Sequence, residues 1–261
     1  MIIKCKICNS SMNPIFTGKI LKKYSIQYYN CPSCQYVCTE EPYWLDEAYE
    51  KSINVTDTGI LLRNLHLSKI SSCILFIFFK KNCKCLDYGG GYGIFTRLMR
   101  DIGFDYYWSD PFTQNMFAQG FEYKGDFKDI EVITSFENFE HFHDPIENID
   151  KIFTISKNII FSTELLPDPI PKPEEWWYYG LEHGQHISFY SRKTIQAIAK
   201  KYGIYYYSSG NLHFFTHKKI NKMLWLLVCK FSIHIVFPLV CLKMKSKTFS
   251  DMRYLIGKMG V

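Results

Sequence analysis

A glycine-rich turn at residues 86–93, with the sequence Leu-Asp-Tyr-Gly-Gly-Gly-Tyr-Gly, constrains the fold of this chain more than any other stretch. The residues before it, 83–86, read as a short strand, and apolar residues recur at helical spacing over 94–100. Glycines let a backbone turn sharply and approach a ligand closely. The first N–H groups of the following helix are then free to bind a polar ligand. The sequence therefore predicts the first half of a nucleotide-binding crevice.

The spacing of these glycines excludes a dinucleotide fingerprint. A G-x-G-x-x-G pattern that starts at Gly89 and Gly91 needs its third glycine at position 94, which is an isoleucine. The residues present, Asp87, Gly89, Gly91 and Gly93, resemble motif I of the class I S-adenosylmethionine (SAM) methyltransferases. The resemblance implies that SAM is the cofactor, that Asp87 helps to hold its ammonium end, and that the glycines line its methionine part. The alternative is an ordinary flexible turn.

Two further acidic residues follow predicted strands and are candidate cofactor ligands. Asp110 ends the apolar run 104–109, where an acid is placed to accept hydrogen bonds from both ribose hydroxyls. Glu137 begins the loop after the fourth predicted strand, 130–136, and this loop resembles the superfamily segment that faces SAM. His141 lies in the same loop and has two equally good interpretations. It is either a residue of the site or a structural histidine that covers the sheet with its hydrogen bonds satisfied.

The alternation of strands and helices from about residue 83 to 216 is typical of an open α/β sheet. We expect an α/β fold with a Rossmann-like seven-stranded methyltransferase sheet, a small N-terminal zinc ribbon and a C-terminal helical segment. The predicted domains are a zinc ribbon at 1–40, a linker and helical lead-in at 41–82, a SAM-binding domain at 83–216, and a basic, apolar helical segment at 217–261.

Four of the ten cysteines form two C-x-x-C pairs, Cys5 with Cys8 and Cys31 with Cys34. The first four residues are too short for the apolar core of a signal peptide, so we expect a cytoplasmic protein. Paired C-x-x-C knuckles in an intracellular chain are typical of tetrahedral zinc, and four thiolates leave no open position. The prediction is therefore one structural Zn²⁺; the alternative is scattered reduced thiols.

The net charge of +6 does not indicate a nucleic-acid partner. Residues 211–250 hold seven lysines and no acid, and without those seven the chain has 24 basic against 25 acidic residues. Phosphate binding normally needs a basic face, which the rest of the chain does not provide by composition. A zinc-ribbon RNA methyltransferase is therefore the less favoured enzyme. A non-catalytic scaffold with a vestigial SAM site is the rival from another class, and Asp87, Asp110 and the glycines speak against it.

The segment Gly184-Gln185-His186-Ile187-Ser188-Phe189-Tyr190-Ser191 resembles a motif of zinc-containing sugar C-methyltransferases. Those enzymes carry Tyr-His-Glu-His, an apolar residue, Ser and two aromatics. The resemblance implies a bacterial enzyme that modifies sugars or surface polysaccharides, with His186 as general base and His183 as the alternative base. Gln185 replaces the family's glutamate. We predict that Gln185 contacts the substrate and that Trp176, Trp177 and Tyr179 form a platform for its sugar ring. The alternative for the three aromatic residues is packing in the core.

The reduced set of polar groups favours O-methylation of a sugar or glycan hydroxyl. C-methylation must remove a proton next to a carbonyl and stabilise an enolate, which needs several polar groups. O-methylation needs one base beside one hydroxyl, because SAM supplies a reactive methyl group. C-transfer and transfer to a sugar-linked phosphoryl group stay open as alternatives.

Residues 223–242 form a mostly apolar stretch with three lysines before it and three after it. Its length just spans a bilayer, but Lys230 and Pro238 lie inside it, and a central lysine costs about 2.5–3.5 kcal/mol on insertion. Two other interpretations stand beside a transmembrane span. One is a helix packed on the catalytic domain, and the other is a helix on the inner membrane surface, where lysines meet anionic lipid. The last fits an enzyme that acts on lipid-linked glycans.

Overall fold

The computed structural model describes residues 3–50, 57–125 and 128–259. Packing divides the chain into two compact units, which are described separately. The first comprises the described parts of residues 1–54, 136–154 and 161–217, and the second those of 55–135, 155–160 and 218–261. The predicted zinc ribbon therefore shares a unit with part of the predicted SAM-binding segment. Residues 51–56 of the predicted lead-in lie outside the described residues.

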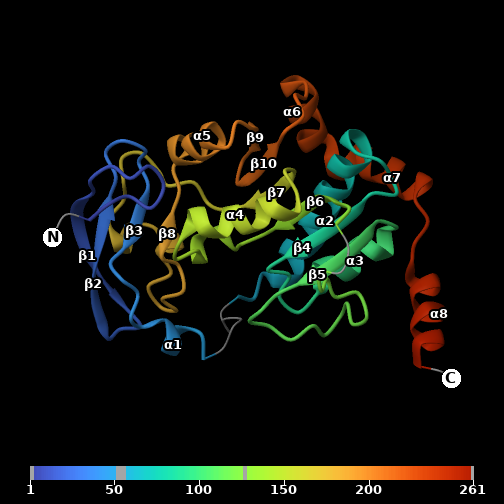
Figure 1. Ribbon diagram of the computed structural model, residues 1–261, viewed down its shortest axis with the longest axis horizontal. Helices are drawn as coiled ribbons and strands as arrows, with labels where there is room; N and C mark the ends of the chain where they lie inside the picture. Colours follow the sequence, from blue (N-terminus) through green and yellow to red (C-terminus); the bar gives the residue numbers. More distant parts are fainter. Residues whose placement is uncertain (1–2, 51–56, 126–127, 260–261) are drawn as a thin grey trace. The chain divides into compact units, whose positions relative to one another are not determined.

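The first unit contains a four-stranded sheet in the order β1-β2-β3-β8 (Figure 1). Its strands are β1 (Asn13–Ile20), β2 (Tyr24–Asn30), β3 (Val37–Thr39) and β8 (Ser188–Phe189). β1 and β2 form an antiparallel hairpin. β8 comes from much later in the chain and pairs antiparallel with β3, with Val37 opposite Phe189 and Cys38 opposite Ser188. The ribbon hairpin thus extends into the segment that carries the predicted base.

Short helices complete the first unit. They are α1 (Leu45–Ala48), the 3₁₀ turn η1 (Phe139–His141), α4 (Pro145–Ile155), the 3₁₀ turns η2 (Pro173–Glu175) and η3 (Trp177–Tyr179), and α5 (Arg192–Lys201). α5 begins at a side-chain cap, in which the Thr194 N–H donates to the Ser191 hydroxyl at 3.1 Å. Such a cap satisfies one of the free N–H groups at a helix start.

The core of this unit is rich in rings. Its members come from the hairpin, from α1 and from residues 166–189, and they include Tyr28, Trp44, Trp176, Tyr178, Tyr179 and Phe189. The ring centroids of Trp176 and Tyr179 lie 5.0 Å apart and those of Tyr28 and Tyr179 5.2 Å apart, in edge-to-face contacts. Such pairs add stability beyond the area that they bury. Much of the high aromatic content of the chain is therefore structural.

An open α/β sheet forms the second architectural element, with six strands among the described residues in the order β5-β4-β6-β7-β10-β9. The strands are β4 (Lys84–Tyr88), β5 (Asp105–Ser109), β6 (Ile130–Ser135), β7 (Ile159–Ser162), β9 (Tyr205–Ser209) and β10 (Leu212–Thr216). β4 pairs in parallel with both β5 and β6, whereas β9 and β10 are antiparallel. This agrees with the predicted fold class.

The seventh predicted strand is reduced to a single bridge. Glu122 forms an isolated parallel bridge with Trp108 of β5, at the edge where another strand would add. The Trp108 N–H donates to the Phe121 carbonyl at 2.9 Å, and the Tyr123 N–H donates to the Trp108 carbonyl at 2.8 Å. Gly120 and Gly125 both have left-handed φ angles, of 85° and 76°. Between these two turns, the described residues form the bridge at Glu122 and no longer strand.

The second unit is completed by helices from both halves of the chain. They are α2 (Ile60–Phe78), α3 (Ile94–Ile102), α6 (Lys222–Phe231), a π-helical turn (Ser232–Val236), α7 (Phe237–Lys243) and α8 (Thr248–Met259). Ile60–Phe78 and Lys222–Lys243 are each long and apolar enough to cross a membrane, with 44 % and 22 % of the apolar window buried. Most of the second stretch is therefore exposed.

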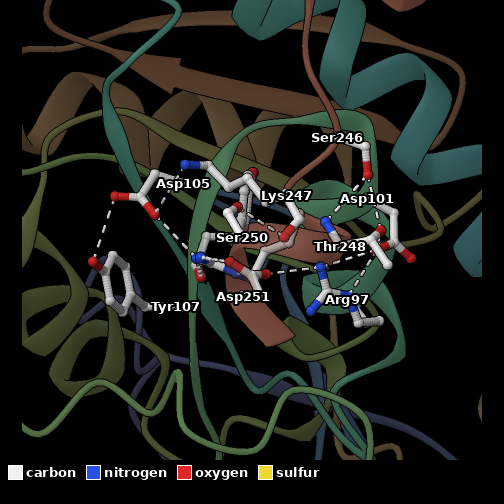
Figure 2. Close-up of polar contacts among 11 residues, drawn as sticks. Arg97, Asp101, Asp105, Tyr107, Ser246, Lys247, Thr248, Ser250 and Asp251 are labelled. Carbon is white, nitrogen blue, oxygen red and sulfur yellow. Dashed lines mark hydrogen bonds and ion pairs between the residues drawn. The ribbon is translucent and has the colours of Figure 1, made fainter. Parts of the chain in front are cut away.

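The C-terminal helix α8 is held to α3 by a buried ion-pair cluster (Figure 2). Arg100 donates to both carboxylate oxygens of Asp251, at 2.8 Å from Nε and 2.7 Å from Nη2. Arg97 adds a third contact to Asp251 at 2.9 Å. Outside this core, the Thr248 hydroxyl donates to Asp101 at 2.7 Å. Asp251 is 5 % exposed and Arg100 4 % exposed, so water solvates neither charge and each depends on its ionic partners.

Replacing Asp251 with asparagine is expected to destabilise the protein by about 3–5 kcal/mol, because it removes the buried carboxylate that pairs with both Arg100 and Arg97 and leaves Arg100 with Asp105 alone. Burial acts to raise the pKa of Asp251, but Arg100 and Arg97 outweigh it and hold that pKa below its usual value. The contribution is therefore complete at neutral pH and is lost as the pH falls below about 4. Denaturant unfolding at pH 7 and at acidic pH measures both effects.

Asp129→Asn is the matched control, because Asp129 pairs with Lys84 at 2.8 Å with its side chain 65 % exposed. An exposed pair is worth about 0–1 kcal/mol. Equal losses of unfolding free energy in the two variants would show that the Arg100–Asp251 pair does not anchor α8.

Candidate functional site

The glycine turn between β4 and α3 has the backbone that its sequence predicts. Gly89, Gly91 and Gly93 have φ angles of 73°, 52° and 84°, in the left-handed region that only glycine adopts without strain. A Cβ at Gly93 would lie 2.6 Å from the side-chain oxygen of Asn115. Gly93 also directly precedes the first residue of α3. The turn is therefore tight and ends at a helix N-terminus.

Asp87 lies buried beneath this turn. Its two carboxylate oxygens accept hydrogen bonds from the hydroxyls of Thr96 at 3.0 Å and Thr134 at 3.1 Å. Burial raises the pKa of Asp87 to about 7, the two threonines oppose this, and the charge of Asp110 adds to it. A cation beside Asp87 would favour its ionised form. The predicted contact with the SAM ammonium group stays a prediction.

Asp110 joins the glycine turn to the end of β5. One carboxylate oxygen accepts from the Gly91 N–H at 2.9 Å. The other accepts from the N–H groups of Phe112 at 2.8 Å and Thr113 at 3.0 Å. The carboxylate thus orders two loops at the carboxyl ends of β4 and β5. In open α/β sheets, ligands bind beyond these strand ends.

Asp110→Ala is expected to weaken SAM binding by roughly tenfold to a hundredfold, because it removes the predicted ribose acceptor and releases the glycine turn. Isothermal titration calorimetry with SAM measures the change. Asp110→Asn keeps one acceptor oxygen and should fall between the alanine variant and the wild type. A folded alanine variant with wild-type affinity would place the cofactor elsewhere.

The segment after β6 begins with a strained residue. Glu137 has a φ angle of 48°, which an L-residue adopts at a cost of about 1–2 kcal/mol. Ser162 offsets this cost, since its hydroxyl accepts from the Glu137 N–H at 2.9 Å and donates to Glu137 Oε1 at 2.5 Å. Such conformations cluster at functional sites. Glu137 stays a candidate SAM ligand.

Two histidines in the first unit, His141 and His186, each contact a backbone carbonyl through ring nitrogen Nδ1. His186 Nδ1 lies 2.7 Å from the carbonyl oxygen of Tyr178, and His141 Nδ1 lies 3.0 Å from that of Gln185. A carbonyl only accepts, so the hydrogen bonds assign the proton to Nδ1 in both rings. Nε2 is then the basic atom of each. The ring centroids lie 5.0 Å apart.

Burial keeps both rings neutral near pH 7. It lowers the pKa of His141 to about 4, although the carbonyls of Gln185 and Glu137 oppose it. Burial also lowers the pKa of His186 well below its usual value, with His141 and His183 adding to the effect. An unprotonated Nε2 can accept a proton or bind a metal ion.

His183 has the opposite tautomer. Its Nδ1 accepts from the Gln185 N–H at 3.1 Å, so in the neutral ring the proton sits on Nε2. The His183 and His186 ring centroids lie 4.7 Å apart. Of the two predicted bases, His186 therefore has the geometry of a base, whereas the basic nitrogen of His183 is already engaged.

The four predicted zinc ligands come together in the first unit. Cys5 Sγ lies 3.6 Å from Cys34 Sγ, and Cys8 Sγ lies 3.5 Å from Cys31 Sγ. Tetrahedral zinc with Zn–S bonds of about 2.3 Å places its sulfurs slightly less than 4 Å apart, so the cluster fits the ion. Both knuckles have the same kind of turn. The Asn9 N–H donates to the Cys5 carbonyl in the first, and the Gln35 N–H donates to the Cys31 carbonyl in the second.

The second knuckle also anchors the segment that carries His186. The Cys34 carbonyl accepts from the hydroxyls of Thr194 at 2.8 Å and Ser191 at 3.4 Å. The Tyr36 hydroxyl lies 2.6 Å from that of Ser188 in β8. The four-cysteine cluster therefore supports the histidine segment directly.

Comparison with known proteins decides the family. A family model described as "Methyltransferase domain" matches residues 62–209, more than half of the chain. The chain belongs to this methyltransferase family. It has the α/β methyltransferase fold and is a SAM-dependent methyltransferase, as the glycine turn predicts. No curated protein matches the chain.

Solved structures with this fold are distant relatives. CalO1, a methyltransferase of calicheamicin biosynthesis with bound SAH, is 14 % identical with a TM-score of 0.43 over 67 % of this chain and 59 % of that one. The plantazolicin methyltransferase BpumL is 13 % identical with a TM-score of 0.46, over 77 % and 88 %. Phosphoethanolamine N-methyltransferase 2 of Haemonchus contortus is 15 % identical with a TM-score of 0.46, over 75 % and 54 %. The methyltransferase thus spans about three fifths of the length of CalO1.

The predicted substrate residues of this methyltransferase divide into core and surface. Trp177 is 74 % exposed, whereas Trp176 and Tyr179 are 8 % and 0 % exposed in the aromatic core. The predicted sugar platform is therefore reduced to Trp177. Gln185 is buried, and its side-chain amide donates to the Ala48 carbonyl at 2.8 Å. Its backbone carbonyl orients His141, and its backbone N–H donates to His183.

Sequence reasoning did not select Glu140, which lies beside His141 and is fully buried. It also did not select Tyr49, whose hydroxyl lies 2.9 Å from His141 Nδ1. An acid directly before a histidine in the loop after β6 was the only signal for Glu140.

Proposed function

We propose that this methyltransferase transfers the SAM methyl group to a hydroxyl of a sugar or glycan. The observation that carries the proposal is the imidazole lone pair at His186 Nε2, fixed by the Nδ1 contact to the Tyr178 carbonyl. The acceptor O–H gives its proton to Nε2, the oxygen forms a bond to the methyl carbon, and the S–CH₃ bond breaks to leave S-adenosylhomocysteine. This chemistry needs one base.

The carbohydrate acceptor is supported by two features of the first unit. Trp177 exposes its ring in the 3₁₀ turn η3, and a flat aromatic face packs well against the apolar face of a pyranose. The order Gln185-His186-Ile187-Ser188-Phe189-Tyr190 resembles the sugar C-methyltransferase motif. Gln185 binds the Ala48 carbonyl and stands where those enzymes carry a glutamate.

A screen of methyl transfer from radiolabelled SAM tests the acceptor class. Nucleotide sugars, polysaccharide fragments, lipid-linked glycans and RNA are offered to the full-length protein, and the products are mapped by mass spectrometry. O-methylated sugar is the expected product. Methyl groups on carbon, on a phosphoryl oxygen or on RNA would each overturn the proposal. SAM binding without transfer to any acceptor would indicate a scaffold.

We further propose that α6 and α7 lie on the inner membrane surface. Trp225, Val228 and Val240 are buried, whereas the other side of the helix exposes Leu224, Leu227, Phe231, Ile235, Leu239 and Leu242. Seven lysines and no acid flank or interrupt this face within residues 211–250. Each lysine near anionic lipid contributes about 1 kcal/mol. A surface helix of this kind suits a lipid-linked acceptor.

Flotation with liposomes tests the membrane contact. The protein should float with anionic vesicles at low salt, and less with neutral vesicles or at high salt. The variant Leu239→Glu with Leu242→Glu should stay at the bottom of the gradient, because both side chains are exposed and their replacement spares the fold. Wild-type protein that does not float with anionic vesicles would contradict the proposal.

A further inference from the structure

Glu140 is a buried carboxylate that the fold leaves without a strong partner. It is 0 % exposed, and neither of its side-chain oxygens makes a well-formed hydrogen bond within the described residues. The hydroxyls of Tyr178 and Thr163 lie near it, as does the charge of Glu137. Burying a carboxylate without a partner is costly, so such a group indicates a ligand that satisfies it.

Two neutral histidines lie close to the Glu140 carboxylate. One ligand atom each from Glu140, His141 and His186 lies within 4.8 Å of the others. Ions with bonds of about 2.0–2.2 Å hold their ligand atoms up to about 4.4 Å apart, so a contraction of a few tenths of an ångström closes the site. Both rings already bind a backbone carbonyl through Nδ1. This is the outer contact that orients histidines whose Nε2 binds a metal.

The backbone around these side chains is fixed by other contacts in the first unit. The Ile187 N–H donates to the Glu140 carbonyl at 2.9 Å, which links the two loops that carry the ligands. The Tyr190 hydroxyl donates to the Phe139 carbonyl at 2.9 Å. Phe139 also stacks on Phe161 with a centroid distance of 4.2 Å. The three side chains are therefore preorganised rather than brought together by chance.

We propose that Glu140, His141 and His186 bind a divalent transition-metal ion, in a site separate from the four-cysteine zinc site. Two imidazoles and one carboxylate suit manganese, iron, cobalt or zinc, and they leave coordination positions open. The role of the ion rests on the proposed function. A bound ion would hold the acceptor hydroxyl and lower its pKa, so that its proton could pass to water as the oxygen bonds to the methyl carbon and the S–CH₃ bond breaks. His186 Nε2 would then act through the ion, as a ligand, instead of accepting the proton itself, and both roles need its lone pair.

Metal binding is tested on full-length protein whose cysteine site is loaded with zinc. Equilibrium dialysis against Co²⁺ and against Mn²⁺ measures a further equivalent of metal. We expect one equivalent in the wild type and at least tenfold weaker binding in Glu140→Gln, which nearly preserves the shape of the side chain. Glu47→Gln is the matched control, because Glu47 lies in the same unit and pairs with Lys23 on the surface. It should bind like the wild type.

SAM affinity and circular dichroism, measured in parallel, show that the variants fold. His186→Gln replaces Glu140→Gln if the latter does not fold, with the same expectation. No further equivalent of either ion in the wild type, or equal binding in wild type and folded variants, overturns the proposal. Metal binding without methylation of any sugar would refute the proposed function alone. Sugar methylation that needs no added ion, by protein that binds none, would refute the metal site alone.

Discussion

Replacing Cys31 with serine is expected to cost the protein one equivalent of zinc and the fold of its first unit. Structural zinc contributes roughly 10–16 kcal/mol to folding in small zinc domains, which exceeds the stability of most proteins. The loss reaches beyond the hairpin, because β3 pairs with β8 and the Cys34 carbonyl holds Ser191 and Thr194. Metal analysis and near-ultraviolet circular dichroism measure the two changes, and methyl transfer should disappear with them.

Cys38→Ser is the control for this variant. Cys38 is buried in β3 of the same sheet but lies outside the four-cysteine cluster. It should keep its zinc and lose at most a little stability. A Cys31→Ser protein with wild-type zinc content and cooperative unfolding would show that the cluster is not a zinc site.

Local features of the fold can be predicted from the sequence. The glycine turn has the left-handed φ angles that its spacing requires, and Ser191, which is a favoured N-cap residue type, caps α5. Both depend on contacts within a few residues, which a sequence pattern records directly. The single bridge of Glu122 to β5 lies between the turns at Gly120 and Gly125, and the pattern of apolar residues does not reveal it.

Features that depend on distant residues are harder to predict. The two-residue strand β8 joins the ribbon sheet only because Ser188 and Phe189 pair with β3, which lies far earlier in the sequence. A pair of residues has no periodicity to detect. The rings of Trp176 and Tyr179 illustrate the same limit, because aromatic residues are equally suited to a sugar-binding surface and to a core. Burial decides between them, and burial is a property of the whole fold.

The candidate site shows the limit most clearly at Glu140 and Gln185. The sequence suggests that Gln185 is a weakened copy of a catalytic glutamate. In the fold, its side chain binds the Ala48 carbonyl and its own carbonyl orients His141. The carboxylate beside the histidines comes instead from Glu140, in the loop after β6. The chemistry required of a site can be met by a residue from another loop, which spacing within one motif does not reveal.

His186→Ala is expected to lower kcat by roughly a hundredfold to ten-thousandfold, the usual contribution of a positioned acid–base group. SAM affinity should not change, because the residues predicted to bind the cofactor around the glycine turn belong to the second unit. Single-turnover kinetics with the acceptor found in the screen, together with SAM titration, separate the two effects. The loss is expected whether Nε2 accepts the proton or binds an ion, since either role needs its lone pair.

His183→Ala is the matched comparison, because the two rings lie 4.7 Å apart and differ in tautomer. The basic nitrogen of His183 is occupied by the Gln185 N–H, so this variant should lose about tenfold or less, through a looser loop. The opposite ranking, with His183→Ala inactive and His186→Ala active, would assign the base to His183. It would also mean that the Nδ1 contact of His186 to Tyr178 serves only the fold.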